Sequence, residues 1–165
     1  MKELFDQVLY ALERGENVVL CSILASSGSA PRGAGAKMAV FPDGTALGTI
    51  GGGAVERIAQ QRALELFRTG ASYCQAFCLA PNQVNDIGMI CGGNVMVYFR
   101  FFDCKNPQDA ALVRAILELL HGGQDAWLVS RMEQGKITAM GTFDEAHGLR
   151  FAQLDEQMLR LWLTS

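Results

Sequence analysis

The chain has 165 residues, a formal net charge of −3 and a hydrophobic fraction of 50%. This length indicates a single domain, and the apolar content excludes an intrinsically disordered chain. The acidic balance, without a basic cluster, excludes nucleic acid as the expected partner. Every apolar run is shorter than the roughly 20 residues that a membrane-spanning helix needs. The five cysteines show no paired spacing, so we interpret them as reduced thiols of a cytoplasmic protein.

Helices and short strands alternate along the first half of the chain. The spacing of apolar residues predicts a helix over 3–14 and another over 54–68. Residues 17–25 are apolar with little alternation, which is typical of a central strand covered on both faces. Residues 37–41 and 46–50 flank Pro42-Asp43-Gly44-Thr45, a strong turn signal, and are predicted to pair as a β-hairpin.

The second half continues the alternation. Strands are predicted over 72–79, at the end of 89–102, over 126–132 and over 136–143. Asn106-Pro107 is a good helix start, and a last amphipathic helix holds Leu154, Met158, Leu161 and Trp162. We therefore expect an α/β or α+β layered domain, in which helices cover a mixed β-sheet that contains one β-hairpin.

Two glycine-rich loops bracket the predicted hairpin. The first, 26–35, carries Arg32 between small residues, where a guanidinium is exposed and suited to phosphate or carboxylate. The second, Gly51-Gly52-Gly53, follows an apolar strand and opens into a helix, where backbone N–H groups attract anions. These features predict a pocket for an anionic ligand, although a tight strand–helix connection explains the triple glycine equally simply.

Two further residues have open alternatives. Glu56 lies in the first turn of the helix after the triple glycine, where it either compensates the helix dipole or accepts hydrogen bonds from a ligand. Cys91, followed by Gly92 and Gly93, is either an exposed thiolate able to bind a metal or carry sulfur, or a small buried hydrophobic residue. Cys21 lies in a predicted core strand and is expected to be inert.

Three motifs together resemble one family. They are Gly28-Ser29-Ala30-Pro31-Arg32, Gly48 to Glu56 (Gly-Thr-Ile-Gly-Gly-Gly-Ala-Val-Glu) and Cys91-Gly92-Gly93. Their order and spacing are similar to those of the amino-terminal domain of the XdhC/CoxI family, and the resemblance covers roughly residues 1–103. We expect residues 1–165 to form one domain, in which 104–165 is a helix–strand–strand–helix extension. The second, Rossmann-like domain of typical full-length members is expected to be absent.

The resemblance implies a maturation role. XdhC-like proteins bind the molybdenum cofactor, which sometimes carries a nucleotide, while a cysteine desulfurase helps to install its sulfido ligand. They then assist its insertion into xanthine dehydrogenase or a related molybdenum hydroxylase. The implied partners are this hydroxylase, the desulfurase, a separate Rossmann-domain chain and a second copy of the chain. The implied cofactor-binding residues are Ser29, Arg32, Gly51, Gly52, Gly53, Glu56, Cys91 and Gly92, with Cys91 as the candidate molybdenum contact.

Two other functions compete with that of a chaperone without turnover. One is a phosphate- or nucleotide-dependent transferase that uses Arg32 and the glycine loops. The lack of an acidic pair for Mg²⁺ disfavours it. The other is a structural subunit whose glycine loops pack against a separate Rossmann chain. The residues alone leave the client hydroxylase, the nucleotide and the oligomeric state open.

Overall fold

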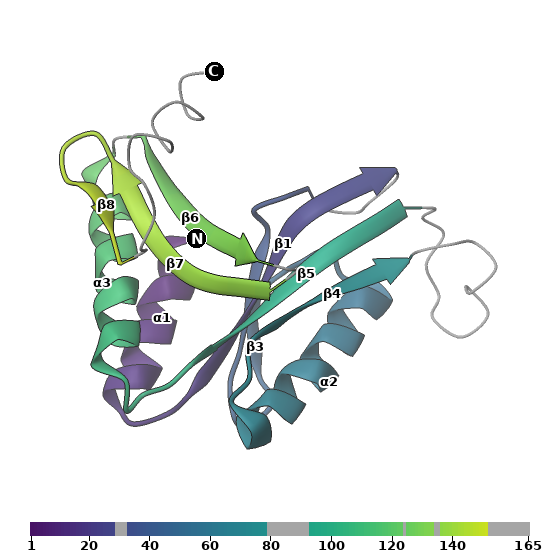
Figure 1. Ribbon diagram of the computed structural model, residues 1–165. Helices are drawn as coiled ribbons and strands as arrows, with labels where there is room; N and C mark the ends of the chain where they lie inside the picture. Colours follow the sequence, from purple (N-terminus) through teal and green to yellow (C-terminus); the bar gives the residue numbers. More distant parts are fainter. Residues whose placement is uncertain (29–32, 79–92, 124, 134–135, 152–165) are drawn as a thin grey trace.

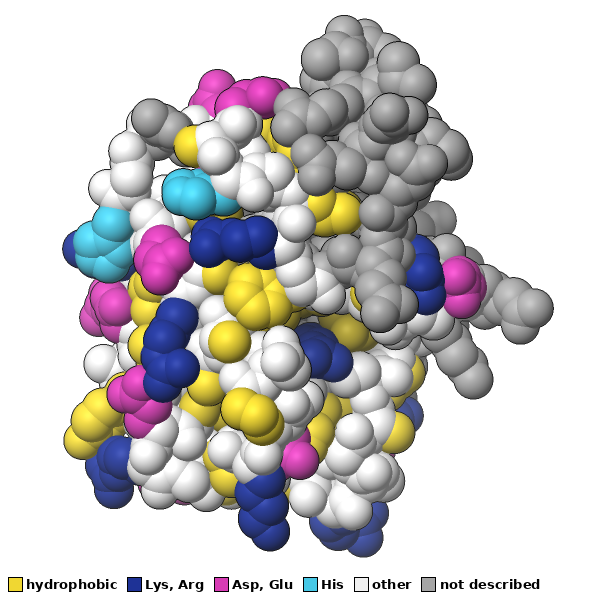
Figure 2. Space-filling model, turned by 60° about the vertical axis from the view of Figure 1, so that its left-hand side comes forward, with side chains coloured by type: hydrophobic (Ala, Val, Ile, Leu, Met, Phe, Trp, Pro, Cys, Tyr) yellow, Lys and Arg dark blue, Asp and Glu magenta, His cyan; other side chains and the backbone are white. Residues whose placement is uncertain are grey.

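A computed structural model describes residues 1–28, 33–78, 93–123, 125–133 and 136–151. Figure 1 shows the arrangement of the elements, and Figure 2 shows the surface on the side where α3 and β8 lie. In chain order the elements are α1 (Lys2–Glu13), β1 (Val18–Gly28), β2 (Lys37–Val40), β3 (Ala46–Gly48), α2 (Gly53–Thr69), β4 (Tyr73–Cys78), β5 (Gly93–Phe102), α3 (Pro107–Gly122), β6 (Ala126–Glu133), β7 (Lys136–Asp144) and β8 (Gly148–Arg150). The predicted α/β class is confirmed. The predicted last helix lies outside the described residues.

A five-stranded sheet in the order β3-β2-β1-β5-β4 forms the centre of the fold. Its strand pairs are all antiparallel, so the prediction of a mixed sheet was wrong in this respect. The residues indicate which segments are strands but not the direction in which they pair. The short β2–β3 connection forces one antiparallel pair, whereas β4 and β5 pair antiparallel across a longer connection that would also permit the parallel direction. The hairpin of β2 and β3 is confirmed. Asp43 Oδ1 stabilises its turn by accepting hydrogen bonds from Thr45 N (2.9 Å) and Thr45 Oγ1 (2.7 Å).

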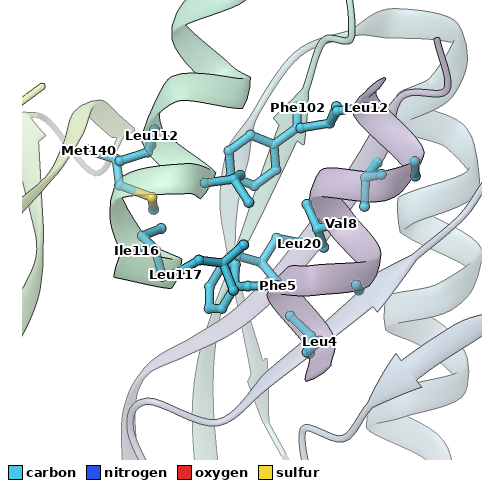
Figure 3. Close-up of a cluster of buried hydrophobic side chains, with 14 of the residues drawn as sticks. Leu4, Phe5, Val8, Leu12, Leu20, Phe102, Leu112, Ile116, Leu117 and Met140 are labelled. Carbon is cyan, nitrogen blue, oxygen red and sulfur yellow. The ribbon is translucent and has the colours of Figure 1, made fainter. Parts of the chain in front are cut away.

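Helices cover both faces of this sheet. Along β1, Val18 and Leu20 belong to a buried cluster with α1 and α3, whereas Val19 and Cys21 belong to a second cluster with α2. Figure 3 shows the first cluster, in which Phe5 of α1 lies next to Leu117 of α3. Because successive side chains of a strand point to opposite faces, a strand buried on both sides lacks alternation. The predicted central strand is therefore confirmed.

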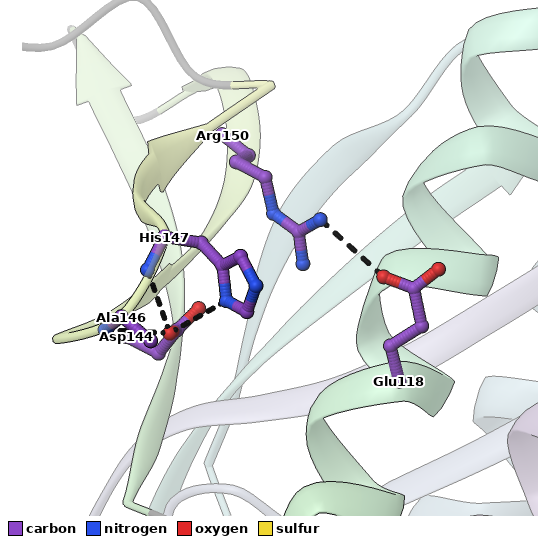
Figure 4. A network of polar contacts seen from close by, with 5 residues as sticks. All are labelled: Glu118, Asp144, Ala146, His147 and Arg150. Carbon is purple, nitrogen blue, oxygen red and sulfur yellow. Dashed lines mark hydrogen bonds and ion pairs between the residues drawn. The ribbon is translucent and has the colours of Figure 1, made fainter.

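A second, three-stranded sheet in the order β6-β7-β8 packs against α3. Its β7–β8 turn is built by Asp144, whose Oδ1 accepts hydrogen bonds from the backbone N–H groups of Ala146 and His147 and contacts His147 Nδ1 at 2.9 Å (Figure 4). Arg150 Nη1 then donates to Glu118 Oε2 of α3 at 3.3 Å. The sequence did not predict β8, because the strand has three residues and, unlike β3, follows no Pro-Asp-Gly turn signal.

Candidate functional site

The triple-glycine loop lies at the end of the five-stranded sheet where β1 ends. The last turn of α2 packs against the other end, since the Phe67 and Phe101 rings meet at 6.2 Å and Phe101 pairs with Val19 near the start of β1. A helix of 17 residues is about 25 Å long, so its first residue, Gly53, lies near the far end of the sheet (Figure 1).

The other two predicted motifs flank strands at this same end. Gly28, the last residue of β1, pairs with Gly93, the first residue of β5, and Cys78 at the end of β4 pairs with Asn94. The chain thus leaves β1 and enters β5 at adjacent points. The predicted site residues Ser29, Arg32, Cys91 and Gly92 lie outside the described residues, so their contacts stay a prediction.

The backbone of the loop explains why three glycines are needed. Gly51, Gly52 and Gly53 have φ angles of +130°, +74° and +60°, which side chains with a Cβ atom rarely adopt. A Cβ atom added at Gly52 would meet no heavy atom within 4 Å. The loop therefore has open space beside it, and a ligand can approach its backbone closely.

Glu56 holds this loop in place. Its Oε2 accepts hydrogen bonds from Thr49 Oγ1 at 2.6 Å, from Gly52 N at 2.9 Å and from Ile50 N at 3.3 Å. Thr49 Oγ1 in turn accepts one from Gly51 N at 3.1 Å. The carboxylate thus takes up the Gly52 N–H, one of the groups that the sequence offered to an anion, as well as the Ile50 N–H. It also places a negative charge at the start of α2, where the helix dipole favours it. A direct contact of Glu56 with a ligand stays a prediction.

Sequence reasoning missed two residues beside the loop, Thr49 and Lys37. Lys37 accepts a backbone hydrogen bond from Thr49 N at 3.0 Å, and its Nζ donates to Gly35 O at 3.2 Å. Burial lowers the pKa of the Lys37 ammonium. Lys37 and Thr49 line one wall of a cavity of about 350 Å³, and the start of α1 lines the opposite wall. The only signal for Thr49 in the sequence is its position two residues before the glycines and seven before Glu56.

The three cysteines whose side chains the structure describes, Cys21, Cys74 and Cys104, add no reactive group to this site. Cys21 is fully buried, as predicted, and burial raises the pKa of its thiol far above the usual range. Cys74 and Cys104 are half-buried free thiols on the opposite face of the sheet, against the α1 and α3 cluster. Among the residues that the structure describes, no group of three His, Cys, Asp or Glu side chains lies close enough to hold a metal ion.

The amino-terminal part of the chain matches the XdhC and CoxI family. The match covers residues 11–77, which include the first two motifs and end before Cys91. The predicted resemblance is confirmed for this region. No curated protein sequence matches the chain.

The fold is also found among solved structures. It is similar to a crystal structure described as a xanthine dehydrogenase from Bacillus halodurans, with a TM-score of 0.74 and 16% sequence identity. The similarity covers 92% of this chain and 45% of that chain, so the chain spans less than half the length of this structural relative. At this identity the likeness concerns the fold.

Proposed function

We propose that this domain binds the molybdenum cofactor and assists its transfer to a molybdenum hydroxylase, without turnover of its own. The observation that carries the proposal is the family match, which coincides with the glycine loop that Glu56 and Thr49 hold in a defined shape. The fold shared with a protein described as a xanthine dehydrogenase supports it.

The further proposed partners are a cysteine desulfurase, a separate Rossmann-domain chain and a second copy of this chain. The cytoplasm is the proposed location. Among the described residues, no helix has the length and apolar character to cross a membrane.

The described part of the glycine loop has room for one part of the molybdenum cofactor. The open space beside Gly52 admits close approach of a flat or charged group to the backbone. The N–H groups of Ile50 and Gly52, however, already donate to Glu56. A phosphate would therefore be held by other donors, for which we propose Arg32. When bound, the cofactor would supply the molybdenum that receives the sulfido ligand.

The residues of the site have distinct proposed roles. Glu56 is the proposed positioning residue, because its carboxylate accepts hydrogen bonds from Thr49, Ile50 and Gly52 of the loop. Cys91, next to the start of β5, is the proposed thiolate contact to molybdenum. Arg32, after the end of β1, is the proposed phosphate ligand. The pairing of Gly28 with Gly93 supports placing these two residues on one side of the sheet end.

Anaerobic titration with molybdenum cofactor tests this function. After gel filtration, pterin fluorescence and molybdenum are measured in the protein fraction. We expect near-stoichiometric retention by the parent chain and a loss of at least tenfold in Cys91→Ala and Arg32→Ala, which corresponds to about 1.4 kcal/mol or more. Arg114→Gln is the matched control, since Arg114 forms an exposed ion pair with Glu13 on the helices α3 and α1.

Two outcomes would contradict the proposal. If folded Cys91→Ala and Arg32→Ala retained the cofactor as well as the parent, the residue assignment would be wrong. If the parent retained none, either alone or mixed with a Rossmann-domain chain, the domain would not be a cofactor-binding chaperone. The structural-subunit hypothesis would then be the better one.

A further inference from the structure

A second candidate site is an apolar cavity on the face of the central sheet that α1 and α3 cover. It has a volume of about 350 Å³ and lies between the start of α1, the end of α3 and β6. Its inner wall is buried, because Phe5 and Ile116 belong to the cluster shown in Figure 3. Its rim is open to solvent, because Met1 and Leu120 are 56% and 40% exposed. A molecule in solution can therefore enter this cavity from the surface.

The side chains of this lining are mostly apolar. Leu119 and Leu120 of α3 and Trp127 and Leu128 of β6 all contribute, and each of them is at least partly exposed. Scattered single hydrophobic residues are normal on a protein surface, whereas exposed apolar side chains gathered around one hollow indicate a binding site. The cavity is therefore suited to the apolar body of a ligand.

Lys37 of β2 is the only charged side chain among the described residues that line this cavity. In the part of the chain that the structure describes, no carboxylate forms an ion pair with its half-buried ammonium. Burial lowers the pKa of this ammonium. A cation that is partly removed from water without a counter-ion is costly, so an anion in the cavity would relieve this cost.

The Lys37 side chain lies on the correct face of the sheet to meet such an anion. Its neighbour Ala39 on the same face of β2 belongs to the cluster with α1 and α3, whereas Met38 belongs to the cluster with α2. The Lys37 ammonium donates one hydrogen bond, to Gly35 O at 3.2 Å. Since an ammonium carries three N–H donors, two remain for a ligand.

From these observations we propose that the cavity between α1, α3 and β6 binds a small amphipathic monocarboxylate. The apolar body lies between Phe5, Leu120 and Trp127, and the carboxylate accepts hydrogen bonds from Lys37 Nζ. One ammonium balances one negative charge, whereas a phosphate dianion would leave a charge unpaired beside apolar side chains. None of the three glycines of the loop lines this cavity, so the site goes beyond the proposed function.

Octanoate is the probe that tests this proposal on the full chain. Isothermal titration calorimetry measures the affinity, and the indole N–H resonance of Trp127 in ¹⁵N-labelled protein reports whether the ligand occupies this cavity. We expect saturable binding of octanoate with a shift of the Trp127 resonance. The neutral analogue 1-octanol should bind about tenfold more weakly or worse, because it lacks the charge. Butanoate should also bind at least tenfold more weakly, because it buries fewer methylene groups.

Two pairs of variants separate the cavity from the rest of the surface. Lys37→Met keeps the length of the stem but removes the charge, and should weaken octanoate binding by about tenfold; Lys105→Met, at an exposed lysine outside the cavity, should leave it unchanged. Leu120→Glu places a negative charge at the rim and should abolish binding. Leu64→Glu is its matched control, because Leu64 is 41% exposed on α2 and lies outside the cavity.

Several results would overturn the proposal. Equal affinities for octanoate and 1-octanol would show that Lys37 does not recognise the anion. Octanoate binding that survives in folded Leu120→Glu, or that is lost equally in Leu64→Glu, would show that the ligand does not occupy this cavity. Absence of saturable binding would remove the site altogether. Cofactor retention is measured with a different ligand, so the two proposals can fail separately.

Discussion

Substitution of Gly48 by alanine tests the packing that places the glycine loop. Gly48 is the last residue of β3 and has a φ angle of +84°. A Cβ atom at this position would lie 2.5 Å from the backbone oxygen of Lys37 and 2.7 Å from Cδ1 of Leu4. The leucine can rotate away, but the carbonyl belongs to the neighbouring strand β2, so β3 must move.

The free-energy cost of Gly48→Ala has two parts. The left-handed backbone of an alanine costs about 1–2 kcal/mol, and forcing an extra methyl group into a packed site costs about 1–3 kcal/mol. We therefore expect Gly48→Ala to lower the free energy of unfolding by about 2–5 kcal/mol, a large share of the about 5–15 kcal/mol of a typical domain. Because Thr49 follows directly and donates to Lys37 O, the glycine loop should be displaced as well.

Alanine substitutions at Gly44 and Gly122 distinguish the backbone cost from the packing cost. Gly44 has nearly the same φ angle, +85°, but no heavy atom would lie within 4 Å of its Cβ, so Gly44→Ala should cost only the backbone term of about 1–2 kcal/mol. Gly122, in α3, has neither constraint, and Gly122→Ala should stabilise by about 0.5–1 kcal/mol. Guanidinium chloride unfolding followed by circular dichroism measures all three. If Gly48→Ala were no more destabilising than Gly44→Ala, the clash with Lys37 would be refuted.

Three further predictions concern Glu56, Asp144 and Cys21. Glu56→Ala leaves the Gly52 N–H and two other donors without their acceptor, so the free energy of unfolding should fall by roughly 2 kcal/mol in the same assay; an unchanged value would mean that the loop keeps its shape without the carboxylate. Burial alone would raise the pKa of Asp144, but hydrogen bonds from His147 and from backbone N–H groups hold it below the usual value. This carboxylate therefore stabilises the fold above its unfolded pKa of about 3.9, and the stability advantage over Asp144→Asn should shrink as the pH falls below about 4; a difference independent of pH would contradict this. Iodoacetamide should leave Cys21 unmodified in the native protein and modify it after unfolding, as mass spectrometry can show, whereas labelling of the native thiol would contradict its burial.

The elements that repeat a pattern over many residues were predictable. The helix 54–68 and the helix beginning at Asn106-Pro107 correspond to α2 and α3, and the apolar run after Asn17 corresponds to β1. The antiparallel pairing of the whole sheet was not predicted, because the residues of a strand do not specify the direction of its neighbour. The short strand β8 was not predicted, because it has no periodic pattern and, unlike β3, no strong turn signal before it.

The candidate site was only partly accessible to sequence reasoning. The triple glycine signalled a special backbone, and the structure confirms three positive φ angles. The sequence left the role of Glu56 open between dipole compensation and ligand contact, and the structure shows its carboxylate accepting hydrogen bonds from Gly52 N and Ile50 N just before it in the chain. The contact of Lys37 with Thr49, which crosses from β2 to the residue after β3, was not predicted.

The sequence by itself determined the glycine-rich motifs, the family resemblance over residues 11–77 and the layered alternation of helices and strands. These features are local, since periodicity, turn residues and motif spacing act within a few residues of the chain. Tertiary structure alone decided that Gly28, which begins the first motif, pairs with Gly93, which ends the third, and that Arg100 and Arg131 line one cavity. Such juxtapositions join residues far apart in the chain, and they depend on which side chains fill the space between the layers.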